Sequence, residues 1–358
     1  MNNETKGGGL LLYGANGYTG NLIAHLAASR GMRPILAGRD AGKIEALAAE
    51  LDLPHAVFSL EDSRALDASL RDVSVVLHCA GPFSRTSKPM ADACLRASAH
   101  YLDITGEIAV FEALAARDRE AKEAGIMLLP GTGFDVVPSD CLAAHLKRRL
   151  PEAVKLTLAI QGLTRISHGT ATTMVENINR GGLVRRDGRL TSVPAAWRTR
   201  TIDFGRGPVS ATTIPWGDVS TAYHSTGIPN IEVYAAMPAG MRRMMKASRA
   251  LGWLLKTESA QGFLKRRIKA QPAGPSDEER ARGRSLLWGE VEDASGRKAA
   301  ARLQGPEGYT LTAMTALAIA ARALDGDAPV GFQTPSRAYG ADFILEIEGV
   351  RREDLDGE

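Results

Sequence analysis

The stretch GLLLYGANGYTG, residues 9–20, decides the fold class. It starts with an apolar run of strand length, which leads into a glycine-rich turn and then a helix-length segment. Gly14 allows a sharp turn off the strand, Gly17 lacks the Cβ that would block a pyrophosphate, and Gly20 permits close contact between helix and strand. This strand–turn–helix context predicts a dinucleotide-binding loop rather than a merely structural turn, even though Asn16 departs from GxGxxG. The expected contacts are Gly14, Asn16, Gly17, Tyr18, Thr19 and Gly20.

The same alternation of strand-length and helix-length segments continues to about residue 150. We expect strands at 9–13, 34–37, 56–58, 73–79, 100–103 and 126–129, and helices at 22–29, 43–51, 89–98 and 109–124. Such βαβ units form a doubly wound parallel sheet. The predicted fold class is therefore α/β, with a Rossmann domain over residues 1–150.

Beyond Pro151 the pattern changes to segments of alternating polarity, such as 155–161 and 231–236. A helix-like stretch at 170–180, a hairpin turn at 293–296 and a helix at 312–324 accompany them. We expect a second, α+β domain with a mainly antiparallel sheet over residues 151–330. The closing segment, 331–358, is expected to return to the Rossmann domain.

Composition excludes several classes of protein. Of 358 residues, 44% are hydrophobic and 24% are charged, which is ordinary for a globular chain and excludes wholesale disorder. The formal charge of +3 is too balanced for nucleic-acid binding. Three cysteines without a CxxC pair, and an amino terminus without an apolar run, predict a cytoplasmic protein with reduced thiols and no metal site.

Residues 241–270 are the compositional outlier, with nine basic residues against one acid. Met241, Met244 and Met245 recur with Leu251 and Leu255 at helical spacing. Such a segment can make a weak peripheral contact with an anionic membrane or cover a carrier-bound substrate. The alternative is a solvated helix packed on the second domain.

The end of the second expected strand indicates which dinucleotide binds. An NAD site usually presents a carboxylate there to the ribose 2′-hydroxyl. This chain instead has Arg39, which can form a bidentate contact with a 2′-phosphate, and Lys43 adds charge. We therefore predict NADP(H). In the alternative, Asp40 binds the ribose and Arg39 is a surface residue.

Further cofactor contacts are expected after the other strands. In CAGPF, residues 79–83, the small Gly81 would let the nicotinamide ribose approach, with Ala80 and Pro82 beside it. Asp62 could accept from the adenine amino group, although an acid that opens a helix is often only a cap.

The substrate cleft is expected where two later loops follow strands, because such sheets bind ligands at the carboxyl ends of their strands. The residues concerned are Thr105, Gly106, Glu107, Gly133, Phe134 and Asp135. Asp135 could instead cap the helix that starts near Pro138. The Tyr-xxx-Lys pair of short-chain dehydrogenases is absent, as are HExxH, GxSxG and the P-loop motif.

Besides Lys88 in the first domain, the candidate proton donors lie in the second domain. His224, Tyr223 and His168 lie in polar stretches there, and histidine is the commonest proton donor near neutral pH. A lone histidine is nevertheless more often structural, so both interpretations stay open.

Six motifs together resemble the saccharopine dehydrogenase-like oxidoreductases, which include trans-acting enoyl reductases. They are GANGYTG (14–20), AGRD (37–40), CAGPF (79–83), HYLDITGE (100–107), PGTGFDVVPSD (130–140) and TPSRAYG (334–340). The resemblance implies hydride transfer, and a second domain that closes over the nicotinamide and often pairs subunits, so we expect a homodimer. The leading hypothesis is an NADPH-dependent reductase of a C=C or C=N bond in a small-molecule, carrier-linked or lipid-linked substrate. The alternative is a non-catalytic NADP(H)-sensing regulatory protein.

Overall fold

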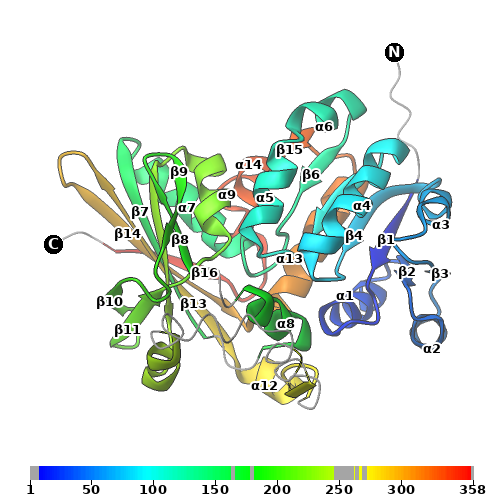
Figure 1. Ribbon diagram of the computed structural model, residues 1–358, viewed down its shortest axis with the longest axis horizontal. Coiled ribbons are helices and arrows are strands. Elements are labelled where there is room, and N and C mark those ends of the chain that lie inside the picture. Colours follow the sequence, from blue (N-terminus) through cyan, green and yellow to red (C-terminus); the bar gives the residue numbers. More distant parts are fainter. Residues whose placement is uncertain are drawn as a thin grey trace. The chain divides into compact units, whose positions relative to one another are not determined.

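The computed structural model describes residues 8–162, 166–177, 181–245, 262, 266–267 and 272–355 (Figure 1). The chain divides into two compact units. The first, which we call the Rossmann unit, comprises Met1–Asp135 and Tyr309–Ala338. The second, which we call the sheet-B unit, comprises Val136–Gly308 and Tyr339–Glu358.

The Rossmann unit is built on a seven-stranded parallel sheet with the order β15-β6-β5-β4-β1-β2-β3. The order reverses between β1 and β4, as in a doubly wound sheet. The strands are β1 (Gly9–Tyr13), β2 (Ile35–Gly38), β3 (His55–Val57), β4 (Val73–His78), β5 (His100–Asp103), β6 (Met127–Leu129) and β15 (Gly331–Phe332). The predicted α/β fold class is confirmed.

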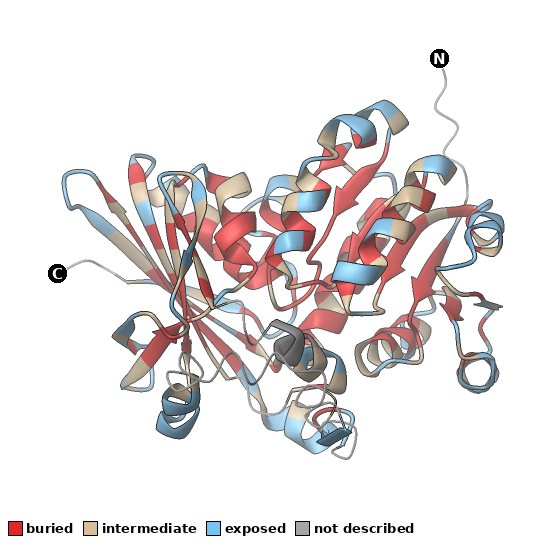
Figure 2. Cartoon of the chain, viewed as in Figure 1, coloured by how far each residue is buried: buried red, intermediate tan, exposed pale blue. Residues whose placement is uncertain are grey.

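The strands at the centre of this sheet, β1, β4, β5 and β6, are largely buried on both faces, as parallel strands between helices must be, whereas the edge strand β3 is largely exposed (Figure 2). Leu11, Val76, Tyr101 and Leu128 come from four strands and pack in one core cluster with Phe332. Burial on both faces explains why the sequence shows continuous apolar runs here rather than alternation.

Helices connect these strands, and several begin earlier than expected. They are α1 (Tyr18–Ser29), α2 (Ala41–Leu51), α3 (Ser63–Ser69), α4 (Phe83–Ala97), α5 (Ile108–Ala115), α6 (Asp118–Ala124), α13 (Gly308–Leu324) and α14 (Pro335–Tyr339). Helix α4 contains Pro89, which the sequence analysis placed at its start. The single helix expected at 109–124 is two helices, and α3 was not expected.

The sheet-B unit is built on a mixed, mostly antiparallel sheet of nine strands. Seven follow the order β10-β11-β12-β7-β13-β14-β16, while β8 pairs with β12 and β9 pairs with β8. Among the strand pairs of the described residues in this sheet, β12 and β7 are parallel and the others are antiparallel. The strands are β7 (Ala153–Gln161), β8 (Gly182–Arg186), β9 (Arg189–Val193), β10 (Thr199–Asp203), β11 (Pro208–Thr213), β12 (Asn230–Ala236), β13 (Arg284–Asp293), β14 (Lys298–Pro306) and β16 (Arg351–Leu355). The helical segments are α7 (Val137–Arg149), α8 (His168–Asn177), α9 (Asp218–Thr226), α12 (Asp277–Arg282) and η1 (Phe343–Glu346). The predicted α+β class of this part is confirmed.

Sheet B curls so that its edge strand β10 reaches back toward β14, although four strands separate them in the sheet order. Arg302 on β14 donates from Nε to the carbonyl oxygen of Asp203 on β10, at 3.0 Å. Inside the curl, Ile202 packs with Tyr234 and Trp288 in a second core cluster.

The division into units differs from the expected boundaries at residues 150 and 330. Helix α7 belongs to the sheet-B unit, where Leu146 packs so closely on Gly289 that an added Cβ would lie 2.7 Å from its Cδ1. Helix α13 belongs to the Rossmann unit, since Thr315 donates to the carbonyl oxygen of Thr132. The closing segment returns to the Rossmann unit only as far as residue 338, and β16 completes sheet B.

Most of the basic segment 241–270 lies outside the described residues, so its predicted membrane or carrier contact is not tested. Met241 and Met244, at its start, are exposed. Within the part of the chain that the structure covers, no helix has the length and apolar character needed to cross a membrane.

Candidate functional site

The glycine-rich loop joins β1 to α1 and lies against the end of β4. Gly14 has a φ of +82°, and a Cβ on it would lie 2.8 Å from the amide nitrogen of Ala80. Its own N–H donates to the carbonyl oxygen of Ala37, at 2.7 Å. Only glycine fits this position, because both the dihedral angle and the neighbouring backbone exclude a side chain.

The rest of the loop brings the amino terminus of α1 to the carboxyl edge of the sheet. A Cβ on Gly20 would lie 2.2 Å from the carbonyl oxygen of Gly14, so α1 can approach the loop only with glycine there. Gly17 is the N-cap residue, and no side chain within the described chain caps α1. Uncapped helix N–H groups bind phosphate oxygens, so the loop fits the pyrophosphate of a dinucleotide.

The next two residues, Tyr18 and Thr19, form the first turn of α1. The ring of Tyr18 meets that of Tyr309 edge to face, with 5.0 Å between the ring centroids. This contact ties the start of α1 to α13 within the Rossmann unit.

The end of β2 carries the residues expected to choose between NADP and NAD. Asp40 caps α2 by accepting from the N–H of Lys43, and its other oxygen lies 2.8 Å from Nζ of Lys43. These hydrogen bonds lower the pKa of Asp40. Both of its oxygens are therefore engaged, which weakens the alternative in which Asp40 binds the ribose.

Arg39 is exposed and has no carboxylate partner among the described residues. The side chain of Asn16 reaches this strand end, since a Cβ on Gly38 would lie 3.0 Å from its Oδ1. The loop and the end of β2 thus form one surface, on which Arg39 is available to an anion.

The end of β4 is organised by a carboxylate that the sequence analysis assigned to the substrate cleft. Glu107 accepts from the N–H groups of Phe83 and Ser84, at 2.8 and 3.2 Å, and so caps α4. Pro82 is the N-cap residue of α4, and the peptide bond between Gly81 and Pro82 is cis. Glu107 therefore holds the Gly81–Pro82 turn against the loop that follows β5.

Asp62 caps α3, since its Oδ1 accepts from the N–H groups of Arg64 and Ala65. The capping interpretation is therefore confirmed. Its predicted contact with adenine stays a prediction.

A buried carboxylate, Asp103, links the two loops of the expected substrate cleft. Its Oδ1 accepts from the N–H groups of Thr105 and Gly131, each at 2.9 Å, and its Oδ2 accepts from the hydroxyl of Tyr101 at 2.6 Å. The hydroxyl of Thr105 in turn accepts from the N–H of Glu107. The sequence analysis named Thr105 but missed Asp103 and Tyr101, although both stand in the HYLDITGE motif.

The loop after β6 is held by α13. The N–H of Phe134 donates to the hydroxyl of Thr312 at 3.0 Å, and a Cβ on Gly133 would lie 2.7 Å from Cγ2 of Thr312. Gly106 packs on Asp135, because a Cβ on Gly106 would lie 2.6 Å from Oδ2 of that residue. The predicted cleft residues thus meet in the Rossmann unit, at the ends of β5 and β6.

Two carboxyl groups at these strand ends have raised pKa values. Burial raises the pKa of Asp103 to about 6 against the hydrogen bonds that it accepts, and burial also raises the pKa of Asp135 to about 6. No side chain of the described residues caps α7, so the alternative in which Asp135 is a helix cap is wrong. Asp135 is thereby left as a carboxyl that can exchange a proton near neutral pH.

The candidate proton donors lie in the sheet-B unit, except Lys88 on α4, whose ammonium lies 2.7 Å from the carboxylate of Asp92. Tyr223 and His224 are neighbours on α9, and the guanidinium of Arg185 stacks 4.2 Å from the ring centroid of Tyr223. His168 begins α8, and its N–H donates to the carbonyl oxygen of Ala273. Catalytic roles for His168, Tyr223 and His224 stay predictions.

Comparison with known proteins supports the cofactor assignment. Residues 10–129 match the family described as the saccharopine dehydrogenase NADP binding domain. The trans-acting enoyl reductase of Mycobacterium leprae is 34% identical over 151 residues, which is 40% of this chain and 36% of that protein. The saccharopine dehydrogenase-like oxidoreductase of Homo sapiens is 26% identical over 161 residues, or 39% and 38% of the two chains. The chain therefore matches little more than a third of the length of these relatives.

Structural similarity to a solved protein covers more of the chain than sequence similarity does. A solved structure of saccharopine dehydrogenase (L-Glu forming) from Saccharomyces cerevisiae superposes with a TM-score of 0.65 over 98% of this chain and 100% of that chain, at 14% identity. At this identity the likeness concerns the fold alone. Together with the glycine-rich loop, the family match leads to one conclusion: residues 10–129 form an NADP(H)-binding domain of the saccharopine dehydrogenase type.

Proposed function

We propose that this protein is an NADPH-dependent reductase of a C=C or C=N bond, acting on a small-molecule, carrier-linked or lipid-linked substrate. One observation carries the proposal: a glycine-rich loop and the uncapped amino terminus of α1 lie beside Arg39, in a domain whose family binds NADP. The trans-acting enoyl reductases among the relatives favour a C=C bond.

The chain's own residues would divide the work of holding the dinucleotide. The N–H groups at Gly17 and the start of α1 would bind the pyrophosphate, and Arg39 the 2′-phosphate. Ala80, which lies against Gly14, and the following Gly81 would leave room for the nicotinamide ribose. A bound nicotinamide supplies the hydride.

The protein must also deliver one proton to the substrate. Asp135 is a candidate in addition to His224, Tyr223 and His168, because its raised pKa leaves part of its population protonated near neutral pH. The network around Asp103 would orient the loop that carries Gly106 and the loop that carries Asp135.

The selectivity of the cofactor site tests the proposal directly. NADPH and NADH affinities should be measured for the wild type and for Arg39→Asp. A charge-assisted hydrogen bond is worth about 1.5–3 kcal/mol, so we expect Arg39→Asp to weaken NADPH by roughly 10- to 150-fold with little change for NADH. Arg71→Asp, an exposed residue just before β4, is the matched control. If Arg39→Asp still prefers NADPH over NADH as strongly as the wild type does, Arg39 does not bind the 2′-phosphate.

Turnover distinguishes an enzyme from a sensor. NADPH oxidation should be followed with enoyl thioesters, cyclic imines and keto acids, and sustained turnover on one of them eliminates the NADP(H)-sensing alternative. No observation on the described residues favours that alternative.

Homodimer formation and a cytoplasmic location also remain proposals. Sedimentation velocity of the full chain would test the first, and fractionation of the source cells the second. A monomer at micromolar concentration would contradict the expected dimer.

A further inference from the structure

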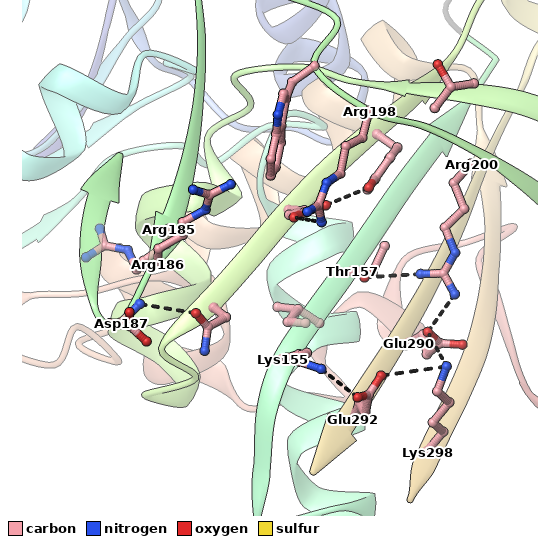
Figure 3. A pocket seen from close by; sticks show the side chains of 16 residues that line it. Lys155, Thr157, Arg185, Arg186, Asp187, Arg198, Arg200, Glu290, Glu292 and Lys298 are labelled. Carbon is pink, nitrogen blue, oxygen red and sulfur yellow. Dashed lines mark hydrogen bonds and ion pairs between the residues drawn. The ribbon is translucent and has the colours of Figure 1, made fainter. Parts of the chain in front are cut away.

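The sheet-B unit contains a concave site of its own, which we call the Arg186 pocket (Figure 3). Its volume is about 660 Å³, within the range of about 300–1,000 Å³ that is usual for small-molecule sites. All 16 lining residues belong to the sheet-B unit. The charged lining consists of Lys155, Arg185, Arg186, Arg198, Arg200 and Lys298 against Asp187, Glu232, Glu290 and Glu292.

The floor of the pocket is set by strand register. Glu292 on β13 stands opposite Lys155 on β7 and Lys298 on β14, and Glu290 stands opposite Thr157. Residues that stand opposite one another across adjacent strands share a face of the sheet. The curl of sheet B brings Arg200 of β10 onto the same face, where it lies 2.7 Å from Glu290.

In the ion pairs of the pocket, each cation is more exposed than the carboxylate with which it pairs. The side chains of Lys155, Arg198 and Lys298 are between 47% and 59% exposed. Those of Glu232, Glu290 and Glu292 are only between 15% and 25% exposed. These pairs therefore present their cations to solvent. Among the other charged lining residues, Arg186 and Asp187 are exposed and Arg185 is buried.

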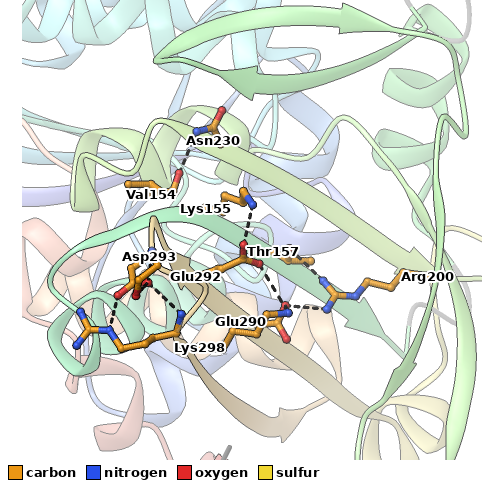
Figure 4. A network of polar contacts seen from close by, with 11 residues as sticks. Val154, Lys155, Thr157, Arg200, Asn230, Glu290, Glu292, Asp293 and Lys298 are labelled. Atoms are coloured by element: carbon orange, nitrogen blue, oxygen red, sulfur yellow. Dashed lines mark hydrogen bonds and ion pairs between the residues drawn. The ribbon is translucent and has the colours of Figure 1, made fainter.

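The carboxylates of the floor already have cationic partners (Figure 4). Lys155 lies 2.7 Å from Glu292, and its hydrogen bond lowers the pKa of that carboxyl. Arg198 lies 2.9 Å from Glu232, which also accepts from the hydroxyl of Tyr234. A cationic ligand would have to displace these partners, whereas an anion can use donors that remain on the cations.

Arg186 supplies the uncompensated charge. Its guanidinium stacks 4.4 Å from the ring centroid of Trp197, and Arg198 stacks on the same ring at 3.9 Å. Arg198 is neutralised by Glu232, but no carboxylate among the described residues pairs with Arg186. The stacking holds a bidentate donor in place at low entropic cost.

We propose that the Arg186 pocket binds a small phosphorylated molecule, with its phosphate anchored on Arg186. Six cations against four acids leave an excess of two positive charges, which matches a phosphate monoester near neutral pH. The volume exceeds what a phosphate group alone would fill, so the pocket has room for the rest of the ligand. The lining of this pocket belongs to the sheet-B unit, whereas the residues expected to bind the dinucleotide belong to the Rossmann unit.

The test is calorimetric titration of the full chain with glycerol 3-phosphate, in saturating NADP so that the dinucleotide site is filled. We expect saturable binding, and a loss of about tenfold or more in Arg186→Gln. Arg282→Gln, which removes the same charge from an exposed residue of α12 outside the lining, should change the affinity less than twofold. Glu290→Gln, which removes a negative charge from the floor, should tighten binding.

Three results would overturn the proposal. They are absence of saturation up to about 10 mM glycerol 3-phosphate, an equal loss in Arg186→Gln and Arg282→Gln, and binding of succinate as tight as that of the phosphate ester. Thermal unfolding of each variant verifies that the fold is retained. NADP affinity is measured separately, so that a failure of the phosphate-binding proposal can be told from a failure of the proposed function.

Discussion

Replacing the buried carboxyl of Asp103 by an amide should change how the stability of the protein depends on pH. In Asp103→Asn the amide oxygen can still accept from the N–H groups of Thr105 and Gly131, and the amide nitrogen can donate to the hydroxyl of Tyr101. The variant therefore imitates the protonated form of the native side chain at every pH.

The expected magnitude comes from the pKa of this carboxyl, which burial raises from 3.8 to about 6 on folding. Because the folded value is the higher one, the group's contribution to stability is complete below about pH 4 and is lost as the pH rises through 6. The interval corresponds to about 3 kcal/mol. The free energy of unfolding of Asp103→Asn minus that of the wild type should accordingly rise by up to about 3 kcal/mol between pH 4 and pH 7.

Urea denaturation followed by circular dichroism, at half-unit pH steps, measures this difference. Using the difference between two proteins cancels the other titrating groups, and Asp72→Asn, at an exposed position before β4, is the matched control. A difference that stays flat or falls with rising pH would refute the reasoning, since burial would then not dominate the titration of Asp103.

Three further substitutions test the packing of the site and of sheet B. Gly20→Ala places a Cβ 2.2 Å from the carbonyl oxygen of Gly14, so we expect at least a tenfold loss of NADPH affinity by fluorescence titration, whereas Gly42→Ala, with open space around it, should bind normally. Glu107→Ala uncaps α4 and should lower the free energy of unfolding by about 1 kcal/mol; a change within error would mean that the cap contributes nothing. Arg200→Ala removes the ion pair between β10 and β13, and calorimetry should show a loss of about 1 kcal/mol, with an unchanged melting temperature as the contrary result.

The Rossmann unit could be predicted from the sequence because its signals are local. Continuous apolar runs and the glycine-rich turn each describe a few neighbouring residues, and all six expected strands form within one residue or so of their predicted bounds. Helix α4 was placed too late because Pro89 suggests a helix start. What permits the earlier start is the carboxylate of Glu107, which lies more than twenty residues away in the chain.

The candidate site could be predicted only in part, for a related reason. Gly14, Gly17 and Gly20 stand out because their missing side chains follow a strand. Asp103 and Tyr101 do not stand out, because the role of the buried carboxylate depends on a hydrogen-bond donor, the N–H of Gly131, which a different loop contributes. The Arg186 pocket lay beyond sequence reasoning altogether, since Arg200 reaches Glu290 only through the curl of sheet B.

The interleaved course of the chain has a practical consequence. The polypeptide passes between the two units three times, near residues 135, 308 and 338. A fragment ending at residue 150 would lack β15, leaving the N–H and C=O groups of β6 without their neighbouring strand, and such bare edges promote aggregation. Because each unit combines two separate stretches of the chain, no single continuous fragment contains one whole unit without part of the other. A circularly permuted or split protein would have to keep both stretches of each unit.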